Sequence, residues 1–518
     1  MTAATILPAA RRNNAILFVA SMGCAMTVLD TNIVGVVLPT IARGLGATFA
    51  DIEWVISAYV LCFSSFLLPA GSLADRFGRK RIFLYGIALF SLASLACGWA
   101  ATASMLYAAR ALQGVGAAFL LAPALAIIGH TFHGKQERDR AWAVWGGVMG
   151  LTMVLSPLAG GVISTFFGWR WAFFINVPIC GLLALAVSNV IDESKNPQAG
   201  PVDIHGIALF VAGMFSLTWA LILGPDRGWE SRDVILRIAC GVWFFFCLVI
   251  VERRKSHPML DLRLFSSWPF VGAVMAMFAY AASAQVMTSL LPLLLQNIEG
   301  KTALAAGIGM LPFAIAMLIF PQLTRFVSHV MSAKQLLVLG LLIVGFGNMV
   351  IAWALTHQHP LFITIGMALL GSGGGILNGE TQKAIMGTIA PDRAGMGSGI
   401  STTARFSGIL LGFASLGAIL SSGVRSALHT QMASAHVAMQ PGFIDHIVSG
   451  DINRAMAMYP DTLAATLRTI AHQAYSSGFS QMLLTASLFA ILAAVFVLMT
   501  LRGDRAKGGK NDQAKTSA

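Results

Sequence analysis

Runs of roughly 20 apolar residues, the length that a helix needs to cross about 30 Å of hydrocarbon, recur along almost the whole chain between short polar breaks. The 518 residues are 57% hydrophobic and only 11% charged, which is far more apolar than a soluble domain of ordinary composition. One soluble core cannot bury so many apolar segments. We therefore predict an all-α membrane protein.

The polar breaks predict fourteen spans, as a group of six helices, an inserted pair and a second group of six. The predicted spans are residues 15–38, 52–74, 82–101, 104–129, 141–166, 171–191, 204–224, 234–251, 268–296, 303–328, 335–356, 360–381, 395–421 and 478–501. The chain is accordingly divided into an N-terminal six-helix bundle (1–191), the inserted pair with a cytoplasmic linker (192–263), the first five helices of a C-terminal bundle (264–422), an external loop (423–477), and the last helix with a cytoplasmic tail (478–518).

Lysine and arginine are distributed unevenly between the two sides of these spans. With the N-terminus inside, 23 of the 34 basic residues lie on the cytoplasmic side and nine outside, while Arg110 and Arg405 lie within spans. The positive-inside rule therefore places both termini in the cytoplasm. The basic residues are scattered singly rather than gathered on one face, so the net charge of +12 does not indicate a nucleic-acid partner.

The longest predicted outside segment follows the thirteenth span and covers residues 423–477. It alternates apolar and polar residues in a helix-like fashion, as in residues 464–474. Two interpretations remain open, an external gate or docking element and a solvated hairpin on the membrane surface, and we favour the hairpin.

The loop between the second and third spans carries one acid among four cations. It reads Gly71-Ser-Leu-Ala-Asp75-Arg76-Phe-Gly78-Arg79-Lys80-Arg81. A positive-inside loop would explain the cations, but it does not explain an acid that is flanked by two glycines. Glycines permit a tight turn between packed helices, and the acid can form ion pairs that a conformational change would break. We therefore predict a conformational switch formed by Gly71, Asp75, Arg76, Gly78 and Arg79.

This loop resembles the signature between the second and third helices of the major facilitator superfamily. Other segments agree with that resemblance: Leu29-Asp30-Thr31-Asn32-Ile33-Val34, Trp54-Val-Ile-Ser-Ala-Tyr59, Arg110-Ala-Leu-Gln113-Gly114-Val-Gly116, Trp169-Arg170-Trp171-Ala-Phe173-Phe174-Ile-Asn176-Val-Pro178, Asp203-Ile-His-Gly206 and His257-Pro258-Met-Leu-Asp-Leu262. Together they are similar to the fourteen-helix EmrB/QacA branch of drug:proton antiporters, and the resemblance covers residues 15–420.

The resemblance implies the major facilitator fold and secondary active transport, with proton-coupled export of small hydrophobic compounds or drugs across a bacterial inner membrane. It implies membrane lipid, protons and a small hydrophobic substrate as partners. A periplasmic membrane-fusion adaptor and an outer-membrane channel would be further partners. No cofactor and no metal are implied.

The fifth span contains Ser156, Pro157, Gly160 and Gly161, which are similar to the antiporter motif of that family. Proline favours a bend, and small residues let a neighbouring helix approach closely and seal one end of a cavity. The chain departs from the family pattern by placing Thr152 and Ser156 where glycines are usual. Both are small, so we expect the seal to be retained.

Ionisable groups inside the spans are the most informative single residues, because a charge at mid-bilayer costs roughly 3 kcal/mol or more. Asp30 on the first span and Arg110 on the fourth lie at similar predicted depths. We interpret Asp30 as a proton carrier, because burial favours the neutral acid and the approach of Arg110 favours the carboxylate. A static buried ion pair is the alternative. Gln113, Arg405 and Asn32 are the candidates for contacts with substrate in the cavity. A packing contact of Gln113 and a structural bond of Arg405 to backbone carbonyls are the alternatives.

The motifs of other function classes are missing from the sequence. Lys301 and Thr302 follow Gly300 without the upstream glycine of a nucleotide-binding loop, and no HExxH or GxSxG motif occurs. An enzyme is therefore a poor interpretation. Two others remain open, an exporter of a specific metabolite or siderophore and a non-transporting membrane sensor on the same fold. Because Asp30 is opposed by two intramembrane arginines, neutral, weakly acidic or monocationic substrates are favoured over dications.

Overall fold

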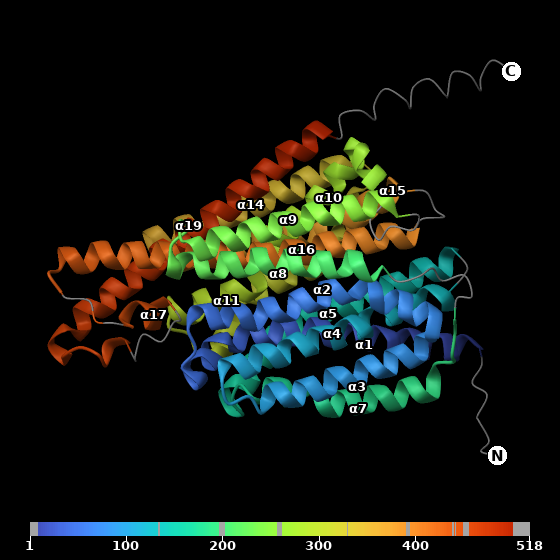
Figure 1. Ribbon diagram of the computed structural model, residues 1–518, viewed down its shortest axis with the longest axis horizontal. Helices are drawn as coiled ribbons and strands as arrows, with labels where there is room; N and C mark the ends of the chain where they lie inside the picture. Colours follow the sequence, from blue (N-terminus) through green and yellow to red (C-terminus); the bar gives the residue numbers. More distant parts are fainter. Residues whose placement is uncertain are drawn as a thin grey trace. The chain divides into compact units, whose positions relative to one another are not determined.

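The computed structural model describes residues 9–132, 135–195, 203–255, 262–328, 330–389, 394–437, 440, 442–448 and 455–500. All regular structure in these residues is helical (Figure 1). Fourteen of the described helical segments are long and apolar enough to cross a membrane. The predicted all-α membrane fold with fourteen spans is confirmed. The predicted tail after residue 500 and the segment of the motif over residues 256–261 lie outside the described residues.

The chain forms two compact units, one made of Met1–Phe246, Thr288–Leu311 and Phe413–Phe479, and the other of Cys247–Met287, Pro312–Gly412 and Ser480–Ala518. The helices up to residue 254 are α1 (Ala9–Leu45), α2 (Phe49–Phe77), α3 (Arg79–Gly98), α4 (Ala103–Thr131), α5 (Lys135–Phe166), α6 (Trp171–Phe174), α7 (Asn176–Val190), α8 (Ile204–Arg227) and α9 (Arg232–Arg254).

The later helices are η1 (Leu262–Ser266), α10 (Trp268–Tyr280), the π-helix η2 (Ala281–Gln285), α11 (Met287–Asn297), α12 (Ala303–Gly309), α13 (Leu311–Val327), α14 (Ala333–His357), α15 (Pro360–Gly387), α16 (Ala394–Ser434), α17 (Phe443–Val448) and α19 (Asp461–Thr500). Three predicted spans, 171–191, 268–296 and 303–328, are each interrupted within the membrane-crossing segment.

Side chains at the polar breaks determine where several helices begin. Thr48 and Asp51 form a capping box that starts α2, and Ser332 and Gln335 form another that starts α14. Each box satisfies backbone N–H groups that have no partner within the helix. The turn from α2 to α3 is made at Gly78, whose φ of 120° is open to glycine and strained for other residues.

Helices α16 and α19 are much longer than the predicted spans at 395–421 and 478–501. They contain 41 and 40 residues, or about 60 Å at 1.5 Å per residue, which is about twice the thickness of the hydrocarbon. The helix-like pattern in the predicted outside segment therefore continues both helices toward α17. Each of the two helices contributes to both compact units.

Helix α4 packs closely against both α2 and α3 within the first unit. A Cβ at Gly114 would collide with the Tyr59 carbonyl of α2, and a Cβ at Gly116 would lie 2.7 Å from the Phe90 nitrogen of α3. Reciprocally, a Cβ at Gly86 of α3 would lie 2.9 Å from the Leu120 nitrogen of α4. Small residues at these positions allow the three backbones to touch.

Candidate functional site

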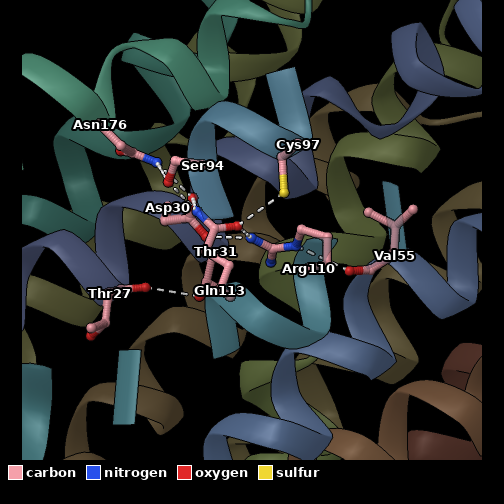
Figure 2. Close-up of polar contacts among 9 residues, drawn as sticks. All are labelled: Thr27, Asp30, Thr31, Val55, Ser94, Cys97, Arg110, Gln113 and Asn176. Atoms are coloured by element: carbon pink, nitrogen blue, oxygen red, sulfur yellow. Dashed lines mark hydrogen bonds and ion pairs between the residues drawn. The ribbon is translucent and has the colours of Figure 1, made fainter. Parts of the chain in front are cut away.

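Asp30 of α1 and Arg110 of α4 form a buried ion pair inside the first unit (Figure 2). The distance from Arg110 Nη1 to Asp30 Oδ2 is 2.5 Å, and the side chains are 1% and 0% exposed respectively. An ion pair removed from water requires further hydrogen bonds to compensate for lost hydration. The remaining side chains of the site provide these bonds.

Three polar side chains from three helices surround the pair (Figure 2). Gln113 Nε2 donates to Asp30 Oδ1 at 2.8 Å and to Ser94 Oγ at 2.8 Å. Asn176 Nδ2 donates to the same carboxylate oxygen at 2.9 Å. Gln113, Ser94 and Asn176 are all fully buried. The carboxylate of Asp30 therefore accepts hydrogen bonds from three donors without contact with solvent.

The charge of Arg110 has partners other than Asp30. Its Nη1 also donates to Gln113 Oε1 at 2.6 Å, and its Nε donates to the Val55 carbonyl at 3.1 Å. The guanidinium lies over the Tyr59 ring, 4.0 Å from the centroid, which adds a cation–π contact. Arg110 is therefore held in place by contacts that do not involve Asp30.

The structure brings together three of the predicted site residues, Asp30, Arg110 and Gln113. Sequence reasoning missed Ser94 and Asn176. The amide of Asn176 within an apolar span was a signal that could have been used, whereas a single serine in a span carries little information. Asn32 is buried, and none of the described bonds to Asp30 involves it, because two positions along a helix turn a side chain by roughly 200°.

Arg405 of α16 lies in the second compact unit and is half-buried. Its Nε donates to Gln285 Oε1 at 2.9 Å. Gln285 is the last residue of the π-helix η2, a local widening that is frequent at functional sites. The partner of Arg405 could not be predicted from the sequence, because nothing in the local pattern indicates a π-helix more than a hundred residues earlier.

The loop between α2 and α3 contains two separate polar interactions. Asp75 accepts bonds from Arg79 Nε at 2.9 Å and Nη2 at 2.8 Å. Glu193 accepts bonds from the backbone nitrogens of Lys80 and Arg81 at 3.1 and 3.2 Å, which caps the start of α3 with a negative charge. This role of Glu193 could not be predicted from the sequence.

The other members of the predicted switch have different surroundings. Arg76 lies over the ring of the adjacent Phe77 at 5.6 Å. Gly71 lies inside α2 rather than in the turn, and a Cβ there would meet only Ala122 at an ordinary 3.9 Å. The expectation of a tight turn therefore applies to Gly78 and not to Gly71.

The motif on α5 lies where this helix packs against α1 and α12. A Cβ at Gly160 would lie 3.2 Å from the Ile33 carbonyl, and one at Gly161 would lie 2.8 Å from the Ala303 carbonyl. The backbone of Pro157 is similarly close to Gly307 of α12. Ser156 donates to the Thr152 carbonyl one turn earlier, so its hydroxyl is satisfied within α5 and does not disturb this packing.

The chain resembles known membrane transporters in both sequence and fold. The model of the Major Facilitator Superfamily matches residues 20–413. The multidrug resistance protein Stp of Mycobacterium tuberculosis is 31% identical over 81% of this chain and 78% of its own length. The tetracenomycin C resistance and export protein of Streptomyces glaucescens is 28% identical over 94% of this chain and 91% of its own.

A solved structure shares the fold at low sequence identity. It is a bacterial homologue of the human lysosomal transporter Spinster, in an inward-facing and unoccupied conformation. The TM-score is 0.65 at 16% identity, and the match covers 94% of this chain and 97% of the other.

Proposed function

This chain belongs to the Major Facilitator Superfamily, and from that premise we propose that it exports small hydrophobic compounds or drugs in exchange for protons. Membership makes the chain a multi-pass membrane transporter rather than an enzyme. One relative is named a multidrug resistance protein and another a resistance and export protein, and both names support export as the direction of transport. Because Asp30 is paired with Arg110, neutral, weakly acidic or monocationic substrates are favoured over dications.

The buried network around Asp30 carries the proposal. In this geometry the carboxylate is stabilised by Arg110, Gln113 and Asn176. A conformational change that moves Asp30 away from Arg110 removes that stabilisation, so the acid binds a proton more readily. Restoring the pair expels the proton. Alternation between the two states links proton movement to the exposure of substrate on opposite sides.

Other predicted residues take supporting roles in this proposal. Gly160 and Gly161 would seal α5 against α1 and α12 at one end of the transport path. Arg405, held by Gln285 beside a π-helix, would contact an acidic or polar group of the substrate. The pair of Asp75 and Arg79 would stabilise one of the two alternating states.

A panel of substrates in proteoliposomes tests the proposed function. With a pH gradient imposed across the membrane, the purified protein should accumulate several chemically unrelated hydrophobic compounds, and collapsing the gradient should stop accumulation. Dications should be poor substrates. If the protein accumulated only one metabolite or siderophore, it would be a dedicated exporter of that compound and not a multidrug exporter. A protein that moves no compound under either condition would contradict transport and favour a sensor.

We propose that the protein lies in the bacterial inner membrane with both termini in the cytoplasm, supported by the 23 to nine division of basic residues. A reporter that is active only in the cytoplasm should be active when fused after Ala518 and inactive when inserted between α16 and α17. A reporter active only outside should give the opposite result. Activity of one reporter at both positions would contradict the fourteen-span topology.

We also propose the segment from the end of α16 through α17 to the start of α19 as the place where a periplasmic membrane-fusion adaptor, and through it an outer-membrane channel, would dock. The lengths of α16 and α19 support this, because about half of each exceeds the hydrocarbon thickness. Cross-linking from α17 in intact cells would capture such an adaptor. If no protein were captured, this docking role would be discarded.

A further inference from the structure

A cavity of about 240 Å³ lies within the first compact unit, apart from the Asp30 network. It is formed by the start of α2, the end of α8, a middle segment of α16 and the end of α17. The lining residues are Thr48, Phe49, Ala50, Glu53, Ile222, Asp226, Ser421, Arg425 and Val448.

Glu53 is the unusual member of this lining. The residue is only 1% exposed, and within the described part of the chain its Oε1 has no hydrogen-bond partner. The carboxylate fits against α16 because position 417 is glycine, where a Cβ would collide with Oε1. The structure therefore holds an acid against a small residue without providing a donor for it.

The other charged groups of the lining neutralise each other. Arg425 forms an ion pair with Asp226 and also donates to Ser421 Oγ. Asp51, on the same helix as Glu53, accepts bonds from the N–H and hydroxyl of Thr48. Glu53, Asp226 and Arg425 are the ionisable residues of the described lining. The cavity is therefore left with one unbalanced acid.

A buried carboxylate without a partner is unstable, so the acid must either bind a proton or face a cation. Ca²⁺ or Mg²⁺ does not suit this cavity, because each takes six or more oxygen ligands and Glu53 is the one carboxylate of the described lining that is not paired with a cation. The walls formed by Phe49, Ile222 and Val448 are apolar. A cavity that combines these apolar side chains with one carboxylate lacking a counter-charge suits an organic monocation.

We propose that this cavity is a binding site for a small organic monocation, with Glu53 as its counter-ion. When the cation enters, the carboxylic acid of Glu53 loses its proton to the solvent and the carboxylate pairs with the cation. When the cation leaves, Glu53 takes a proton again. Binding is independent of the export cycle, and only the use of the cavity as a substrate site on the transport path rests on the proposed function.

Binding of tetraethylammonium to the purified full-length protein tests the site. Equilibrium dialysis with the labelled cation, in detergent and without any gradient, measures affinity, and a pH indicator in weak buffer measures proton release. The wild type should bind the cation and release protons. Glu53→Gln should weaken binding at least tenfold and end the release. Glu137→Gln, the same change at an exposed acid of α5, should behave like the wild type.

A second variant separates the site from effects on folding. Gly417→Ala keeps the acid but places a methyl group where Oε1 lies, so it should also weaken binding. Asp30→Asn should bind the cation as the wild type does. The proposal is overturned if the wild type does not bind tetraethylammonium, if Glu53→Gln and Gly417→Ala bind it normally, or if only Asp30→Asn loses binding. A failure of proton-driven export with intact binding would refute the proposed function alone.

Discussion

Asp30→Asn should abolish the accumulation of substrate driven by a pH gradient, because an amide cannot carry a proton through the cycle. The fold should survive the change. Arg110 keeps its bonds to Gln113 and Val55, and the oxygen of the new amide can accept the bonds that Gln113 and Asn176 donate to Asp30 Oδ1. Uptake into inverted vesicles under an imposed pH gradient is the measurement.

Two controls accompany this variant. Asp192→Asn makes the same chemical change at an aspartate whose side chain is 78% exposed, and it should transport normally. Exchange of labelled for unlabelled substrate without a gradient should persist in Asp30→Asn, because it requires no net proton movement. If the purified variant exchanged substrate for protons at the wild-type rate, another group would carry the proton.

Asp75→Asn should leave the protein inserted but reduce its turnover by about tenfold, which corresponds to about 1.4 kcal/mol in the barrier. The carboxylate receives two bonds from Arg79 across the turn between α2 and α3, and an amide would weaken this charge-assisted contact. The turn itself should persist, because Glu193 still caps the start of α3. Initial transport rates at saturating substrate measure the effect.

A matched variant distinguishes the loss of this particular ion pair from the general loss of a surface charge. Asp233→Asn alters another aspartate–arginine pair four residues apart, with Arg237 on α9, and it should leave turnover unchanged. Equal rates for Asp75→Asn and the wild type would show that the pair does not balance the alternating states.

The spans could be predicted from the sequence because each apolar run is by itself long enough to cross the membrane, whatever the other helices do. The full lengths of α16 and α19 could not be predicted, because the residues beyond the apolar part of each helix are polar enough to form a loop. The interruption of the predicted span 268–296 by the π-helix η2 was also hidden, since a π-helix leaves the hydrophobic pattern intact.

The candidate site was partly predictable for a similar reason. Asp30 and Arg110 are conspicuous as charges in apolar spans, and counting residues gave them similar depths. Asn176 of α7 donates to the same carboxylate, and Ser94 of α3 accepts bonds from Gln113 and Asn176. Such contacts between helices depend on how the helices pack. Glu53 lies so near the start of α2 that the sequence suggests a hydrated position, although the structure buries it.

The backbone contacts of α4 with α2 and α3 determine which part of the proton site can move. With Gly114 against Tyr59 and Gly116 against Phe90, sliding or rotation of one of the three helices would bring backbone atoms into collision, so we expect α2, α3 and α4 to move together as one slab. Arg110 is attached to this slab through Val55 as well as through its own helix. In the proposed cycle, we therefore expect Asp30 to separate from Arg110 by a shift of α1 against the slab, which would make the first helix the moving part.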